Sequence, residues 1–144
     1  MVLPSLLLLA VAHVAAEPSP VGTWRTIDDE THKPRALVRI EERDGALSGR
    51  IVQLFRDPGE DPAPLCTPCA GERHNQPVLG MNILWNFHRH GDAWTDGEVL
   101  DPEEGKIYHA NLRLRDHGAH LDVHGYIGVP LLGRSQIWER VEDN

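Results

Sequence analysis

The chain has no excess of positive charge, because its 14 Lys and Arg residues face 22 Asp and Glu residues, for a net charge of −8. Nucleic acids and anionic membranes both select clustered positive charge, so neither is a predicted partner. The apolar runs fall short of the about 20 residues that a membrane-spanning helix needs, so the chain is not predicted to span a membrane. Hydrophobic residues nevertheless make up 40% of the 144 positions, enough for one folded core.

The chain also lacks the motifs of common enzymes. Ser19, Ser48 and Ser135 do not lie in the Gly-x-Ser-x-Gly turn of serine hydrolases. No glycine-rich phosphate loop precedes a helix, and no pair of acidic residues is singled out by its spacing. The sequence therefore does not predict an enzyme, and no cofactor is expected.

Long amphipathic helices are missing as well, since no long window carries a helical apolar period. The 11 Pro and 13 Gly residues instead separate short alternating segments, which is typical of antiparallel strands. Eight strands are predicted, over residues 22–27, 35–42, 46–55, 82–88, 93–100, 106–115, 119–127 and 134–141.

Two turns fix the expected register. Asp44-Gly45 is a strong hairpin signal, because a type I′ turn needs positive φ at both positions. His117-Gly118 is interpreted as a second two-residue turn. The apolar positions on either side of it then fall on one face, in the pairs Leu114–Leu121, Leu112–Val123, Ala110–Gly125 and Tyr108–Ile127.

Eight strands in local hairpins predict an all-β, up-and-down barrel, which leaves no exposed sheet edge. Such a barrel encloses either packed side chains or one small ligand, and the sequence pattern is the same for both. The residues expected to face inward, and to line a cavity if there is one, are Val38, Ile40, Ile51, Tyr108, Leu112, Leu121, Val123 and Ile127.

The first 16 residues are interpreted as a signal peptide, cleaved after Ala16. The apolar run at 5–16 is too short to span a bilayer, and Val14-Ala15-Ala16 supplies small residues for cleavage. The remaining residues, 17–144, are expected to form one domain in the periplasm or outside the cell. The alternative is that the N-terminal segment is a buried element of the fold.

Residues 56–77 form a long loop without periodicity, and loops of this length are often functional. The loop contains the one cysteine pair, Cys66 and Cys69. In an oxidising compartment the pair is expected to form a disulfide. A redox-active pair, a metal site that includes His74, and two inert thiols remain alternatives.

Histidines supply one candidate metal site. His120, Asp122 and His124 alternate on a predicted strand and share a face, and His109 lies diagonally on the neighbouring strand. Imidazoles two residues apart on a strand can hold zinc or copper together. The competing interpretation is a solvated strand face, on which Asp122 is opposite Arg113.

The two ends of the barrel carry matching residues. Gly22-Thr23-Trp24 begins the first strand, and Trp138-Glu139-Arg140 ends the last. This arrangement resembles that of lipocalins, in which a tryptophan closes one end of the barrel and an arginine from the last strand covers its face. Trp24 and Arg140 are therefore expected to have a structural role.

A broader resemblance covers nearly the whole chain after the leader. The chain resembles a family of secreted bacterial proteins known as domain of unknown function 2147. The matching stretches are residues 21–24, 39–45, 65–69, 71–73, 76–77, 100–103, 105–106, 125–128 and 132–134. The resemblance implies a periplasmic or secreted lipocalin-like domain and supplies no established activity.

Three functions follow from these observations. The first is a secreted lipocalin-like binding protein that holds a small apolar ligand, with the loop at 56–77 over one mouth. The second is an envelope interaction or scaffolding module with a filled barrel, which requires an exposed apolar patch near Trp85, Phe87 or the Val129–Leu132 loop. The third is a metal-dependent function on the His109, His120 and His124 face. The sequence indicates no oligomeric state.

Overall fold

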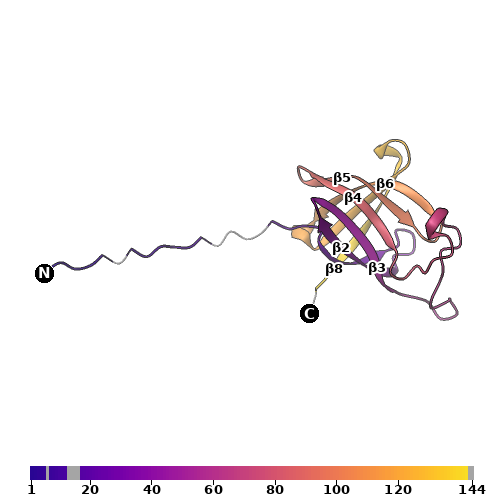
Figure 1. Cartoon of the computed structure of the whole chain (residues 1–144), viewed down its shortest axis with the longest axis horizontal. Helices are drawn as coiled ribbons and strands as arrows, with labels where there is room; N and C mark the ends of the chain where they lie inside the picture. Colours follow the sequence, from indigo (N-terminus) through magenta and orange to yellow (C-terminus); the bar gives the residue numbers. More distant parts are fainter. Residues whose placement is uncertain (6, 13–16, 143–144) are drawn as a thin grey trace.

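The computed structural model describes residues 1–5, 7–12 and 17–142, and its strands form a closed antiparallel barrel in sequence order (Figure 1). The strands are β1 (Gly22–Ile27), β2 (Pro34–Arg43), β3 (Ala46–Leu54), β4 (Asn82–His90), β5 (Ala93–Asp101), β6 (Lys106–Arg115), β7 (His120–Tyr126) and β8 (Arg134–Val141). Short 3-10 turns lie in the connections at η1 (Gly71–Arg73), η2 (Asp116–Gly118) and η3 (Pro130–Leu132). The predicted all-β, eight-stranded barrel is therefore confirmed.

The register of the two hairpins follows their turns and their apolar pattern. Asp44 and Gly45 have φ angles of 53° and 78°, and Val38 pairs with Ile51 across the hairpin. Across the second hairpin, Leu112 pairs with Val123 as expected. Arg115 pairs with His120 as the turn predicts, but β6 ends and β7 begins at these residues, so the connection spans residues 116–119 and includes η2 instead of only His117 and Gly118.

The order of the strands sorts the connections between the two ends of the barrel. The tight turns β2–β3, β4–β5 and β6–β7 lie at one end, with residues 17–21, and we call this the turn end. The connections β1–β2, β3–β4, β5–β6 and β7–β8 lie at the other end, which we call the loop end. The longest connections, residues 28–33, 55–81 and 127–133, all lie at the loop end, so the candidate functional loops are found there.

The barrel interior is closely packed around two glycines. A Cβ atom at Gly97 would lie 2.3 Å from the ring of Phe87, and one at Gly49 would lie 2.9 Å from Leu84 and 3.2 Å from Val38. Neither position has room for a methyl group, and Phe87, Leu84 and Val38 are buried. This part of the interior is filled by side chains.

The N-terminal segment stands apart from the barrel (Figure 1). Residues 1–5 and 7–12 are exposed and contain no strand or helix, so they add nothing to the core. The predicted cleavage position after Ala16 lies outside the described residues. Among the described residues, every strand and every pairing between strands lies within residues 22–141, so the barrel is complete without the predicted leader. In the described part of the chain, no helix has the length and apolar character needed to cross a bilayer.

The packing against Phe87 gives a stability prediction. Gly97→Ala should lower the free energy of unfolding by about 1–3 kcal/mol, because the added methyl must displace a buried ring. Urea unfolding followed by circular dichroism measures the change. Gly125→Ala is the matched control, since a Cβ atom there would lie 3.5 Å from its nearest neighbour, at ordinary contact distance. Equal stabilities of the two variants would mean that the space beside Phe87 is not filled.

Candidate functional site

Trp24 and Arg140 close the barrel at the turn end. They are opposite partners on β1 and β8, and the guanidinium carbon of Arg140 lies 4.3 Å from the centre of the Trp24 ring. The indole nitrogen of the buried Trp24 donates to the carbonyl of Pro20 at 2.8 Å. The tryptophan thus fills this end of the interior, and the arginine lies on its face as a cation–π partner.

Arg140 also joins three segments of the chain. Its guanidinium donates to the carbonyls of Ser19 at 2.6 Å, Val21 at 2.9 Å and Gly118 at 2.7 Å. Hydrogen bonds from a charged donor are stronger than those between neutral groups. An open depression of about 440 Å³ lies beside these contacts, bordered by residues such as Pro18 and Glu142. Trp24 and Arg140 therefore close the barrel interior at the turn end.

The β3–β4 loop covers part of the loop end. Cys66 and Cys69 form the predicted disulfide in this loop, and both are buried in the same apolar cluster as the strands. The Sγ atom of Cys66 lies 3.3 Å from the carbonyl oxygen of Pro102 in the β5–β6 loop. Close approach of the two loops also explains Gly105, where a Cβ atom would lie 2.2 Å from the carbonyl of Pro68.

An ion pair joins the β1–β2 loop to β8 across the loop end. Arg134 binds the carboxylate of Asp29 with two nitrogens, at 2.5 and 2.8 Å, and lies 3.6 Å from Glu30. Hydrogen bonding to Arg134 lowers the pKa of Asp29, although burial opposes the shift. Other ion pairs around this end join Arg35 to Glu103 and Lys33 to Asp57.

The same carboxylate is linked to the core by polar side chains. Gln136 donates to Asp29 at 3.4 Å and accepts from the indole nitrogen of the buried Trp138 at 2.9 Å. This chain of contacts satisfies the buried indole. No sequence signal marks this chain of contacts, because Asp29 and Gln136 are 107 positions apart and neither belongs to a motif.

The β5–β6 hairpin contributes two further titratable groups, Asp101 at the end of β5 and Tyr108 on β6. Asp101 accepts hydrogen bonds from the backbone nitrogens of Glu103 and Glu104, at 2.9 and 3.4 Å, and burial raises its pKa. The hydroxyl of Tyr108 donates to the carboxylate of Glu104 at 2.9 Å. Burial and this hydrogen bond both raise the pKa of Tyr108. Both side chains make their hydrogen bonds within this hairpin.

The residues expected to face inward differ in how far they are buried. The buried ones are Val38, Ile40, Ile51, Leu112, Leu121 and Val123. Tyr108 is half-buried, with its hydroxyl at the loop end. The expectation for Ile127 is wrong: β7 ends at Tyr126, so the pair between Ile127 and Tyr108 does not form, and Ile127 is 57% exposed. Whether any of these residues lines a ligand cavity stays a prediction.

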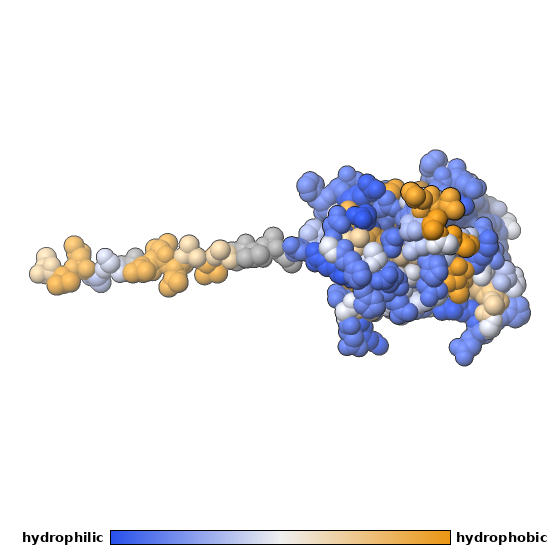
Figure 2. Space-filling view, turned by 90° about the horizontal axis from the view of Figure 1, so that it is seen from above, coloured by the Kyte–Doolittle hydropathy of each residue, from blue (hydrophilic) through white to orange (hydrophobic). Residues whose placement is uncertain are grey.

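The β7–β8 connection forms an exposed apolar surface. We call it the apolar loop and define it by Ile127, Val129, Leu131 and Leu132, whose exposed fractions are 57%, 53%, 94% and 79%. In Figure 1 the connection projects from the barrel, and Figure 2 shows hydrophobic residues gathered on the half of the barrel remote from the N-terminal segment. Of the other predicted positions, Phe87 is buried, and Arg73 lies 4.6 Å over the ring of Trp85.

His124 holds the apolar loop in place. Its Nε2 atom donates to the carbonyl of Pro130 at 2.5 Å, which leaves Nδ1 to accept from the hydroxyl of Ser135 at 2.8 Å. The η3 turn adds a hydrogen bond from the nitrogen of Leu132 to the carbonyl of Val129 at 3.1 Å. The loop therefore has a fixed conformation in which its leucines point away from the barrel.

The histidines predicted as metal ligands do not converge. His124 is used within the apolar loop, His120 pairs with Asp116 at 2.8 Å, and the ring of His109 lies 5.7 Å from that of Tyr126. Across residues 1–5, 7–12 and 17–142, no group of three or more His, Cys, Asp or Glu residues is arranged to hold a metal ion. The Nδ1 atom of His74 is hydrogen-bonded to the carbonyl of Cys69 at 3.0 Å, and both cysteine sulfurs are joined in the disulfide.

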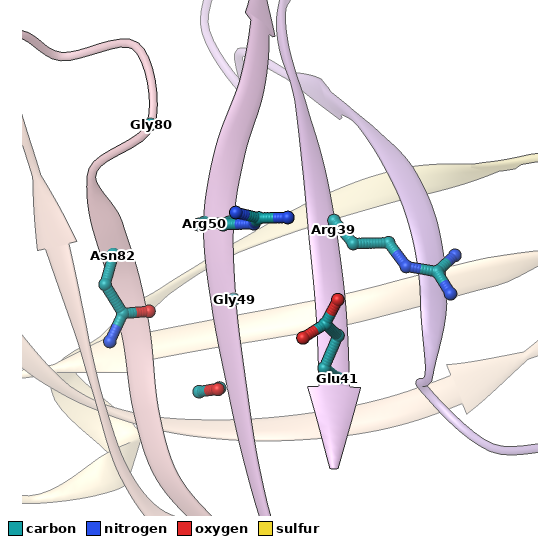
Figure 3. Close-up of a pocket in the computed structure, with 7 residues that line it drawn as sticks. Arg39, Glu41, Gly49, Arg50, Gly80 and Asn82 are labelled. Atoms are coloured by element: carbon teal, nitrogen blue, oxygen red, sulfur yellow. The ribbon is translucent and has the colours of Figure 1, made fainter.

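A smaller depression of about 170 Å³ lies on the outer face of β2, β3 and β4 (Figure 3). Arg39 and Arg50 are opposite partners there, with Glu41 and Asn82 nearby. Figure 3 shows Arg39 extending away from Arg50, and its guanidinium lies 3.4 Å from the hydroxyl of Thr23 on β1. The lining is charged and polar, so this depression does not suit an apolar ligand.

Comparisons with known proteins agree with this architecture. Protein HP1028 from the human pathogen Helicobacter pylori, whose title assigns it to the lipocalin family, is similar in structure, with a TM-score of 0.74. The two are 17% identical in sequence, over 88% of this chain and 85% of that one, so the likeness establishes the fold alone. Comparison with curated proteins gives no significant match.

The barrel is thus lipocalin-like, with a closed turn end and with its loops gathered at the opposite end. A family model described as "Uncharacterized protein conserved in bacteria (DUF2147)" matches residues 22–140, from the first strand of the barrel to the last. The chain belongs to this DUF2147 family of bacterial proteins.

Proposed function

We propose that the protein is an extracytoplasmic interaction module, which binds its partner through the apolar loop and not inside the barrel. The observation that carries the proposal is the exposure of Leu131 and Leu132, at 94% and 79%, on a barrel whose interior is packed around Gly49 and Gly97. Exposed apolar surface costs free energy in water, and on a soluble domain it commonly marks an interaction site.

The position of the apolar loop supports a role in binding. The barrel core is complete without the loop, so its leucines are not needed to stabilise the fold. His124 and η3 nevertheless fix its conformation, and a fixed surface loses little conformational entropy on binding.

The disulfide and the lipocalin-like fold are consistent with an extracytoplasmic protein. We propose that the leader at 1–16 directs secretion, with cleavage after Ala16, and that the mature chain resides in the periplasm or outside the cell. Mass spectrometry of the protein from a bacterial envelope would give this N-terminus directly.

Photo-crosslinking tests the interaction role. A photo-reactive amino acid that replaces Leu131 should form adducts with envelope components when the protein is irradiated in the cells that secrete it. The same amino acid at Glu42, which is exposed on β2 near the turn end, is the matched control. Adducts that are absent at both positions, or equal at both, would overturn the proposal.

A second candidate is a carrier of a small apolar ligand. Two features favour it: the likeness to a lipocalin-family structure, and a loop end covered by separate loops that ion pairs and packing hold together. Because the interior around Phe87 is filled, a ligand would have to displace side chains or the β3–β4 loop. This requirement makes the carrier the weaker of the two candidates.

Native mass spectrometry of protein purified gently from an envelope separates the two candidates. A carrier should show one additional mass that matches a small organic molecule and disappears after denaturation. The interaction module should show the bare polypeptide, two hydrogens lighter because of the disulfide. The additional mass would contradict the filled-barrel proposal.

The ion pair at the loop end predicts a pH dependence. Because the folded pKa of Asp29 lies below its ordinary value of 3.8, the pair stabilises the fold above that value, and the stabilisation is lost as the pH falls through the folded pKa. Asp29→Asn should therefore melt at a lower temperature than the parent near neutral pH, and the difference should vanish in strong acid.

Asp101→Asn is the control for this pH dependence. Burial raises the pKa of Asp101, so its ionised form costs stability above the folded pKa, and protonation removes the cost as the pH falls. This variant should be at least as stable as the parent at neutral pH. A difference between Asp29→Asn and the parent that persists unchanged in strong acid would contradict the role of the ion pair.

A further inference from the structure

We propose that the apolar loop inserts into the surface of a lipid bilayer, so that the partner is the membrane itself; this inference rests on the interaction role proposed above. It names a class of partner that the fold and the family leave open.

The composition of the segment around the loop suits hydrocarbon. Residues 125–133 read Gly-Tyr-Ile-Gly-Val-Pro-Leu-Leu-Gly and contain no Asp, Glu, Lys, Arg or His, in a chain of which 25% is charged. A protein partner would normally meet a polar rim around an apolar centre. A segment without charge over this length instead avoids the cost of moving ionised groups toward the acyl chains.

The shape of the loop suits a bilayer as well. The loop projects from the barrel (Figure 1), and its two most exposed side chains belong to the adjacent residues Leu131 and Leu132 of η3, which we call the tip of the loop. A protein partner would need a matching pocket for this tip, whereas a bilayer needs none. The backbone at the tip is part of η3, so two of its nitrogens, those of Leu132 and Gly133, already have hydrogen-bond partners within the loop.

The base of the loop carries groups that fit the headgroup region. Tyr126 ends β7, directly before the loop, and its ring lies 6.1 Å from that of His124. Tyrosine is favoured at membrane interfaces, because its ring is apolar and its hydroxyl is polar. Ile107, at the start of β6 and therefore also at the loop end, is 45% exposed.

A second copy of the chain is a poorer occupant. The loop offers four exposed apolar side chains, whereas each partner in a stable interface contributes about 20–30 residues. Two apolar loops packed against each other would therefore bury too little surface to hold a dimer together. Partial insertion of a few apolar side chains is sufficient for reversible binding to a membrane.

Charge predicts which membranes are bound. The net charge of −8 and the acidic β1–β2 loop, whose Asp29 and Glu30 lie beside Arg134 at the base of the loop, oppose attraction to anionic lipids. Binding should therefore be driven by apolar insertion, with little dependence on salt, and it should be at least as strong on neutral as on anionic vesicles.

Vesicle flotation tests the inference with residues 17–144, which contain the complete barrel and omit the apolar leader. The protein should float with neutral phosphatidylcholine vesicles, and Leu131→Ser/Leu132→Ser should reduce the partition coefficient by about tenfold or more. Val52→Ser/Ile137→Ser is the matched control, because both residues are 41% exposed on strands outside the loop, and it should partition like the parent. Circular dichroism establishes that each variant is folded.

A second measurement locates the inserted segment. An environment-sensitive dye attached at Leu131→Cys should shift to shorter emission wavelengths when vesicles are added, whereas the same dye at Glu42→Cys should not. Labelling is carried out without a reductant, so that the Cys66–Cys69 disulfide stays intact.

The outcomes separate this inference from the proposed function. No flotation, flotation equal in the serine variants and the parent, or binding only to anionic vesicles would each overturn membrane insertion. If crosslinking from Leu131 in cells then yields a protein adduct, the interaction role stands with a protein partner. If crosslinking from Leu131 gives no adduct either, both the interaction role and membrane insertion are wrong.

Discussion

The barrel depends on the short seam between its first and last strands. Only three residue pairs are in register between β1 and β8, and the central pair is Trp24 with Arg140. The backbone ladder at this seam is supported by the stacked guanidinium and by its hydrogen bonds to three carbonyls. A sheet that failed to close here would leave two open edges and a tryptophan exposed to water. Closure, core packing and the position of the termini therefore depend on the same arginine.

Closure of an eight-stranded sheet also limits what the molecule can do. The enclosed volume is small, and around Gly49 and Gly97 it is used for packing. This packing stabilises the fold but leaves no preformed cavity around these glycines, so we expect the loops to bind partners. Ion pairs join several of the described loops to each other or to the strands, whereas the apolar loop contains no charged residue and has the most exposed leucines of residues 17–142.

The sequence predicted the strands and the hairpin register well, because both follow from local information. Alternation fixes which side chains point inward, and Asp44-Gly45 fixes the pairing of Val38 with Ile51. The prediction that Ile127 faces inward was wrong because the alternating pattern in the sequence continues beyond Tyr126, where the hydrogen bonding of β7 ends. The same limit applies to His124: its spacing from His120 suggested a metal site, but a loop that returns to Ser135 uses both of its nitrogens.

Other features could not be predicted because they depend on distance in space. Whether the interior is hollow is decided by contacts such as that of Phe87 with Gly97 on the neighbouring strand. The Asp29–Arg134 pair joins residues 105 positions apart, and although Arg134 lies in a stretch that resembles the family, nothing in the sequence links it to Asp29. The sequence offered three places for an exposed apolar patch: Trp85, Phe87 and the Val129–Leu132 loop. Only the folded barrel shows that the loop is exposed and that Phe87 is buried.

Both ends of the folded chain leave the barrel at the turn end, since β1 begins there and β8 finishes there. A molecule attached to either terminus is thus held across the length of the barrel from the apolar loop. The domain could be immobilised on a support, or joined to a second domain, without covering its loops. In this respect the barrel acts as a spacer, which presents one end to its surroundings while the other is available as an attachment point.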